Sequence, residues 1–245
     1  MILVDHLGNY LNKLDVDSEP YDVSVTNQNI SYVTQPNSRT VLQIDPDRMV
    51  LLSKVTCNDL HSTVTCVSAV PNTGREYSGK IPCFLGVNKN GMLLRAAVHF
   101  DSILTEVPGS YGVIGSRVVK FHAFDEDSYL SIIGGQNYIK YDEKYGYSSK
   151  NVHIATIDTP TDICSNDNGH IYVSGQGSNT IHRLVKELPD KMITPILDQN
   201  LKVLDIPLGS RHGIKEPVAM CFNYDYSKLY IVNDWGKKVL VFDVI

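Results

Sequence analysis

The sequence predicts an all-β chain, a β-propeller of about six four-stranded blades in which the first blade can be incomplete. The main observation is a recurring spacing. A proline stands about a dozen residues before a tyrosine that is followed by a β-branched residue, at Pro20 and Tyr32, Pro160 and Tyr172, and Pro217 and Tyr230. Apolar residues follow eight after the β-branched residue and twelve after the tyrosine, at Val41 and Ile44, Ile181 and Leu184, and Val239 and Phe242. Such a repeat marks stacked supersecondary units. No segment sustains the apolar period of a helix, so helix is expected in under about 5% of residues.

Each unit is interpreted as strand, turn, strand, tight turn, strand. The clearest unit spans 159–183, where Asn168 and Gly169 supply the positive φ that a tight hairpin requires. Its second turn is the glycine-rich segment 175–179. The same pattern recurs in three further segments, 216–244, 19–45 and, more weakly, 118–142.

Two other segments are harder to assign. Residues 46–117 are interpreted as one irregular blade, with strands expected at 49–55, 62–70, 83–87 and 92–98 and a polar insertion at 71–80. The outer strand before the last unit is expected at either Ile193–Leu197 or Lys202–Ile206. Residues 1–16 match the second and third strands of the other units, which favours six blades with a partial first blade. Five blades are the alternative, with the N-terminal strands completing the last blade.

The composition is typical of one all-β domain, which we expect to span residues 1–245 and to be monomeric when isolated. A net charge of −5 gives no general attraction to nucleic acid or anionic lipid. No apolar run approaches the ~18 residues of a membrane span, and the charged start predicts blade material rather than a signal peptide. Five cysteines without ligand spacing favour a reduced, cytoplasmic protein, with Cys164 and Cys221 as buried thiols.

Two repeats resemble NHL repeats, and the chain looks most like the propeller that closes many tripartite-motif (TRIM) proteins. The residues that carry the resemblance are 160–163, 168–173 and 177–181 in one repeat, and 217–220, 228–234 and 238–242 in the other. In that family the second strand of each repeat commonly ends in Asp. The corresponding positions of this chain are Asp5, Gln35, Gly175 and Asn233. The resemblance implies a protein-binding module. The RING, B-box and coiled-coil domains of a TRIM protein are not recognised, and there is no Cys/His array for zinc.

No catalytic, cofactor or metal site is expected. Asn166, Asp167, Asn168, Asn233 and Asp234, with Glu19 and Glu216, carry oxygen ligands of the kind that a calcium-dependent lactonase or esterase uses. The favoured interpretation is that the Asn and Asp side chains bond the backbone of their own turns. The eight histidines show no metal or triad pattern and are interpreted as satisfied or surface residues. We therefore expect a protein that is not an enzyme, with the calcium-dependent hydrolase as an alternative.

A basic stretch near the C-terminus is the candidate partner-binding surface. Its residues are Arg183, Lys186, Lys191, Arg211, His212, Lys215, Trp235 and Lys237. Acidic residues are interleaved and no aromatic platform accompanies it, so RNA binding is the weaker alternative. The expected ligand is an acidic segment of a protein partner. Tyr32, Tyr129, Tyr172 and Tyr230 occupy equivalent strand positions and are expected to be packing residues between blades.

Overall fold

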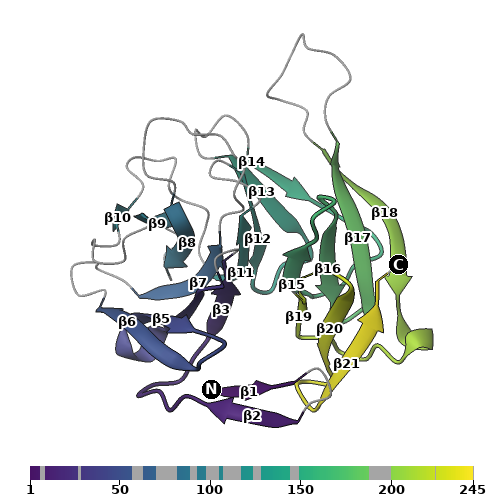
Figure 1. Cartoon of the computed structure of the whole chain (residues 1–245). Helices are drawn as coiled ribbons and strands as arrows, with labels where there is room; N and C mark the ends of the chain where they lie inside the picture. Colours follow the sequence, from purple (N-terminus) through teal and green to yellow (C-terminus); the bar gives the residue numbers. More distant parts are fainter. Residues whose placement is uncertain are drawn as a thin grey trace. The chain divides into compact units, whose positions relative to one another are not determined.

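The chain is built of β-strands in the computed structural model (Figure 1). The structure describes residues 1–5, 9–26, 29–56, 63–69, 82–88, 93–97, 105–106, 117–123, 128–143, 149–187, 200–223 and 225–244. Within these residues there is no α-helix, only the short 3₁₀ helices η1 (Pro36–Ser38) and η3 (Ser210–His212). No helix in this part of the chain is long and apolar enough to cross a membrane. The all-β expectation is confirmed.

The residues divide into two compact units, a first unit Met1–Tyr129 and a second unit Leu130–Ile245. The boundary falls inside strand β12 (Ser128–Ile133). The expectation of one domain stays a prediction.

Three sheets belong to the first unit. The first sheet holds two antiparallel strands, β1 (Ile2–Val4) and β2 (Tyr10–Lys13). The second runs in chain order through β3 (Asp22–Val25), β4 (Ser31–Gln35), β5 (Thr40–Asp45) and β6 (Val50–Thr56). The third holds β7 (Val64–Ala69), β8 (Pro82–Asn88), β9 (Leu93–Ala97) and β10 (Thr105–Glu106). The first sheet has two strands among the described residues, and the choice between five and six blades stays a prediction.

The remaining sheets repeat this order. The fourth sheet is formed by β11 (Val118–Ala123), β12, β13 (Ile139–Glu143) and β14 (Ser149–Val152). The fifth is formed by β15 (Pro160–Ser165), β16 (Ile171–Gly175), β17 (Thr180–Glu187) and β18 (Asn200–Leu208). The sixth has three described strands, β19 (Ala219–Phe222), β20 (Lys228–Asn233) and β21 (Lys238–Asp243). Neighbouring strands are consecutive in sequence, as in the blades of a propeller.

The irregular segment 46–117 also forms ordinary strands. Strand β6 closes the second sheet, and β7, β8 and β9 match the three strands expected in the third. Of the two alternatives for the outer strand of the fifth sheet, Lys202–Ile206 is right, because it lies inside β18. The other, Ile193–Leu197, and the insertion at 71–80 lie outside the described residues.

The second strand of each sheet supplies much of the core. Every residue of β4 and β16 is buried, since these strands have a neighbouring strand on both sides. The packing role of three tyrosines is confirmed, because Tyr32, Tyr129 and Tyr172 are all buried. Tyr230 is only partly buried, in a sheet with one described strand fewer. The buried role expected for Cys221 is wrong, because its side chain is exposed on the face of β19 opposite to the buried Met220.

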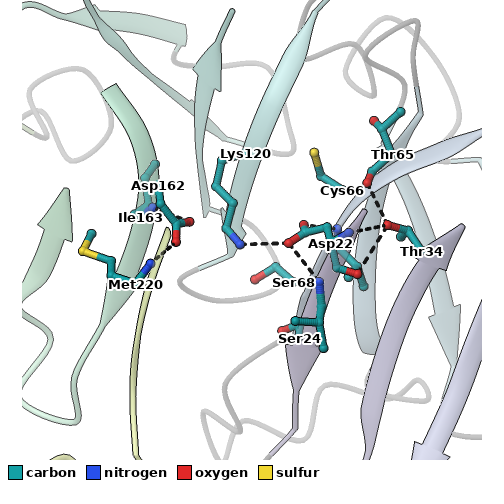
Figure 2. A network of polar contacts seen from close by, with 12 residues as sticks. Asp22, Ser24, Thr34, Thr65, Cys66, Ser68, Lys120, Asp162, Ile163 and Met220 are labelled. Atoms are coloured by element: carbon teal, nitrogen blue, oxygen red, sulfur yellow. Dashed lines mark hydrogen bonds and ion pairs between the residues drawn. The ribbon is translucent and has the colours of Figure 1, made fainter. Parts of the chain in front are cut away.

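Polar side chains connect the first strands of neighbouring sheets in the first unit (Figure 2). The Asp22 carboxylate on β3 accepts a hydrogen bond from the Val67 backbone N–H on β7, at 3.0 Å. It also accepts one from the Lys120 ammonium on β11, at 3.0 Å. Ser24 and Ser68 accept bonds from the Ala69 and Ala123 backbone N–H groups, at 2.7 and 3.0 Å. These contacts satisfy N–H groups at strand edges, where unpaired backbone would be costly.

In the second unit, an aspartate side chain likewise accepts hydrogen bonds from backbone N–H groups. Asp162, on β15, accepts hydrogen bonds from the backbone N–H of Ile163 at 2.8 Å and of Met220 at 2.6 Å (Figure 2). Asp22 and Asp162 both stand two residues after the repeat proline. In the last repeat this place holds Ala219. The aspartates are therefore part of the architecture of the repeat.

Candidate functional site

Several loops of the second unit meet at one end of its sheets. They are the turn before β13, the segment before β15, the turn 176–179 and the segment before β19. The Asn137 side chain donates a hydrogen bond to Asp158 Oδ1, at 2.9 Å, and accepts one from the Thr159 N–H, at 3.0 Å. The N–H groups of Gln176 and Gly177 donate to the carbonyl oxygens of Thr159 and Asp158, at 2.9 and 3.1 Å. These bonds fix the loops against one another.

A pocket of about 370 Å³ opens between these loops. It is lined by Thr159, Gln176, Gly177, Asn179, Lys215 and Glu216. Asn179 Oδ1 accepts a 2.7 Å hydrogen bond from the Glu216 N–H, which ties the two sides of the pocket together. The volume lies at the lower end of the ~300–1,000 Å³ range of small-ligand pockets. The pocket is therefore large enough for a single side chain or another small group.

The turn 176–179 needs its glycines because the backbone passes close to its neighbours. A Cβ atom on Gly175 would lie 2.8 Å from the Ile157 side chain and 2.3 Å from Ser178 Oγ. On Gly177 it would lie 2.4 Å from Asp158 Oδ2. The glycine pattern that the sequence marks as a turn therefore also shapes one wall of the pocket.

The charges around the pocket are only partly paired. The Lys215 ammonium lies 2.8 Å from Asp234 Oδ1. This contact raises the pKa of Lys215 and lowers the pKa of Asp234. The Glu216 carboxylate makes no hydrogen bond or salt bridge to any described residue, and neither does Asp158 Oδ2. Within the lining, the Glu216 carboxylate is therefore an acceptor without a hydrogen bond or salt bridge to a described residue, and Asp158 Oδ2 lies beside the lining residue Gly177.

Trp235 stands beside this pocket as an exposed aromatic side chain. It is the only tryptophan of the chain, and 62% of its surface is exposed. Its N–H bonds the Glu216 carbonyl oxygen at 3.4 Å, and the preceding Asp234 N–H bonds the Lys215 carbonyl oxygen at 2.7 Å. The backbone of Trp235 is left-handed, with φ of 55°, a conformation that these loop contacts hold in place.

The structure brings together some of the residues predicted as a partner-binding surface. Lys215, Trp235 and Lys237 gather around Asp234, with Lys237 Nζ at 4.0 Å from its carboxylate. Arg211 and His212 are exposed in η3, in the segment that leads to Lys215. Sequence reasoning identified these residues for this surface, but it considered Glu216 only as a calcium ligand and Gln176 and Asn179 only as part of a turn.

The other predicted residues have different environments. Arg183 lies on β17 and forms two hydrogen bonds to Asp205 on β18, at 2.9 and 2.5 Å. Lys186 lies further along β17, with its ammonium 5.4 Å from the centre of the Tyr141 ring. Lys191 lies outside the described residues. Arg183 and Lys186 therefore belong to the sheet rather than to the loop end.

The side chains of Asn166, Asn233 and Asp234, which were weighed as calcium ligands, are engaged by other residues of the chain. Asn233 donates to the Gly213 carbonyl oxygen at 3.0 Å and accepts from the Lys215 N–H at 2.8 Å. Asn166 accepts from the His170 N–H across the first hairpin turn, at 3.0 Å. The predicted turn role is therefore confirmed for Asn166. It is wrong for Asn233, whose side chain bonds the backbone of the segment before β19 rather than its own turn. Among the described residues, no group of three or more His, Cys, Asp or Glu side chains is placed to hold a metal ion.

Two histidines are perturbed by burial. His182 is fully buried between the hydroxyl groups of Thr156 and Thr180, at 2.8 and 3.3 Å from its two ring nitrogens, and burial lowers its pKa. His182 is therefore a satisfied core residue. In the first unit, burial and the nearby Lys120 lower the pKa of His122 to about 4.

Solved structures share this fold at low sequence identity. A protein of unknown function from Bacteroides caccae is 13% identical, with a TM-score of 0.60 over 94% of this chain and 80% of its own. The β-propeller domain of Cps50 (Swd1) from Myceliophteria thermophila is 9% identical, with a TM-score of 0.59 over 97% and 74%. Virginiamycin B lyase from Staphylococcus aureus is 12% identical, with a TM-score of 0.55 over 98% and 76%.

The fold thus defines the class of protein: the chain is a β-propeller. These similarities show the fold alone, since β-propellers support many unrelated functions. No family model and no curated protein matches the sequence. The NHL resemblance therefore stays a prediction.

Proposed function

We propose that this β-propeller is a non-catalytic protein-interaction module of the NHL type, which binds its partner through the loop end of the second unit around Trp235. The observation that carries the proposal is the exposed tryptophan on loops held by backbone hydrogen bonds. Large exposed aromatic side chains dominate the binding energy of many interfaces when a partner buries them.

The conformation of Trp235 supports this role. Its loop is fixed by hydrogen bonds from Asp234 and Trp235 to the segment before β19. A loop backbone that is already positioned loses less conformational freedom on binding, so more of the contact energy of the residues it carries appears as affinity. Burial of the indole ring by a partner would also remove a large apolar surface from water.

The charges nearby favour a partner with acidic groups. Lys237, Lys238 and Arg211 are exposed, whereas the chain as a whole carries a net charge of −5. Attraction between exposed charges is screened once the Debye length falls below ~8 Å, above physiological salt. Partner binding should therefore weaken as salt is raised, mainly through a slower association rate.

The test is a comparison of partner retention by the wild-type domain and by Trp235→Ala. Immobilised proteins are incubated with cell extract and the retained proteins are quantified by mass spectrometry. We expect the specific partner to fall by about tenfold or more with Trp235→Ala, as for an interface hot spot. Tyr10→Ala, which removes an aromatic residue that is 61% exposed in the first unit, is the matched control and should retain the partner.

Purified partner then allows a direct measurement. Because Trp235 is the only tryptophan, its fluorescence reports on this site without labelling when the partner contains none. A shift of its emission to shorter wavelength on partner binding is expected. Equal retention by wild type and Trp235→Ala, or partner binding without any change in emission, would place the interface elsewhere.

The proposal includes the absence of hydrolase activity. Asn233 and Asp234, the strongest candidates for calcium ligands, are engaged by backbone N–H and by Lys215. Lactonase and esterase assays with added calcium are expected to stay at background. Turnover that disappears in Asn233→Ala, in a variant that still melts cooperatively, would reverse this part of the proposal.

A further inference from the structure

The pocket beside Trp235 contains acceptor oxygens that make no hydrogen bond to any described residue. Both its backbone N–H groups at Gln176 and Gly177 are already bonded to carbonyl oxygens, and the Thr159 hydroxyl donates to Asp158. The Glu216 carboxylate, the second oxygen of Asp158 and the Gln176 side-chain carbonyl make no hydrogen bond to any described residue. A ligand that fits this lining is rich in hydrogen-bond donors.

The one cation in the lining is directed to another carboxylate. Lys215 follows the β18–β19 connection and its ammonium lies 2.8 Å from Asp234. Asp234 is therefore the partner of Lys215, and Glu216 is left without a salt bridge among the described residues. Because Asp234 pairs with Lys215, the Glu216 carboxylate is available to an external cation.

We propose that this pocket binds the guanidinium group of an arginine side chain presented by the protein partner, with Glu216 as its carboxylate ligand. This deepens the proposed function, on which it rests, by naming one residue type of the partner. Guanidinium offers five N–H donors in a plane and binds a carboxylate through two parallel bonds. The remaining donors can meet Gln176 and Asp158, whereas the ammonium of lysine has only three donors around one point.

The partner segment would then carry an arginine next to acidic residues. The arginine enters the pocket, and the acidic groups lie against Lys237 and Lys238, which are exposed nearby. The indole of Trp235 can add apolar contact with the stem of the arginine or with its neighbours. This combination accounts for a surface that carries exposed lysines together with Glu216, a glutamate that makes no salt bridge to any described residue.

The direct test uses a small probe and the whole chain. Nα-acetyl-arginine N-methylamide is titrated into isotope-labelled protein, and the amide signals of Gly177, Asn179 and Glu216 are followed by NMR. We expect saturable shifts with a Kd of roughly 1 mM, as for a single side chain. The uncharged citrulline analogue has nearly the same shape and should leave these signals in place. Equal binding of citrulline, or tighter binding of the lysine analogue, would overturn the proposal.

Substitution of Glu216 tests whether its carboxylate binds the guanidinium group. Glu216→Gln should weaken arginine binding by about tenfold, because a charge-assisted bond is replaced by a neutral one. The matched control is Glu19→Gln, since Glu19 precedes Pro20 as Glu216 precedes Pro217 and does not line the pocket. It should bind the probe like wild type. Unchanged binding by Glu216→Gln would also overturn the proposal.

Asp234→Asn supplies a second test, in which the substituted residue is not itself part of the pocket lining. It should release Lys215, which then competes for Glu216, and the probe should bind several-fold more weakly. Lys215→Met should bind it at least as well as wild type. If the arginine probe fails while Trp235→Ala still loses the partner, this inference falls and the proposed function stands. If the probe binds while Trp235→Ala keeps the partner, the pocket is real and the proposed interface is wrong.

Discussion

At the residue scale, burial separates two tyrosines that the repeat treats as equivalent. Tyr172 is 4% exposed and packs edge-on against Phe222, with ring centres 5.0 Å apart. Tyr230 occupies the same place in the last repeat but is only partly buried. We predict that Tyr172→Ala lowers the free energy of unfolding by roughly 3–5 kcal/mol, the usual cost of truncating a buried aromatic. Tyr230→Ala should cost clearly less. Urea unfolding of both variants measures this, and equal losses would contradict the assigned packing.

A second residue-scale prediction concerns His122. Its pKa is lowered to about 4 by burial and by Lys120, while an unfolded histidine titrates near 6.5. Between these values the unfolded state binds the additional proton, so stability is lost as the pH falls from about 6.5 to about 4. The loss attributable to His122 can reach roughly 3 kcal/mol.

The comparison that tests it is the pH dependence of unfolding in His122→Gln and in wild type. The variant cannot acquire this charge, so its free energy of unfolding should fall less between pH 7.0 and 4.5. Parallel pH profiles for wild type and His122→Gln would show that His122 is not the group responsible.

At the scale of elements, the Asp22–Lys120 pair links the first strands of different sheets in the first unit. The two side chains are 10% and 19% exposed, so the pair is screened little by solvent. Asp22 also receives the Val67 N–H, and its removal therefore affects both contacts. We predict a coupling energy of roughly 1–3 kcal/mol in a double-mutant cycle of Asp22→Asn and Lys120→Met. The exposed pair Lys228–Asp243 should show much weaker coupling, and equal values for the two pairs would contradict a structural role.

Strands could be predicted from the sequence because their signals are local. The prolines and the tyrosines recur at fixed spacing, and Tyr32, Tyr129 and Tyr172 lie buried in strands that the structure forms. In the weak segment 46–117, strands β6 to β9 lie where the sequence predicted strands. Tyr230 and Cys221 were misjudged because burial depends on which neighbouring strands and sheets cover a side chain, which spacing within one repeat does not specify.

The candidate site was only partly predictable for a related reason. Trp235 and Lys237 lie in one turn and Lys215 belongs to the basic stretch, so composition found them. The pocket depends on pairs that are distant in sequence, such as Asn179 with Glu216 and Asn137 with Asp158. Likewise, the basic stretch predicted a common surface for Arg183 and Lys215, but strand β17 carries Arg183 into a pair with Asp205. Sequence adjacency of charges does not determine which of them remain unpaired.

At the scale of the whole molecule, the remaining question is whether the chain unfolds as one cooperative domain. The residues divide into two compact units, but the boundary falls between Tyr129 and Leu130, inside β12. Both residues are buried in that strand, so a separation there would divide a core element rather than a linker. Domain boundaries normally fall in exposed, flexible segments. We therefore predict a single transition in differential scanning calorimetry, with a calorimetric enthalpy equal to the van't Hoff enthalpy. Two resolved transitions, or a calorimetric enthalpy near twice the van't Hoff value, would show that the two units unfold independently.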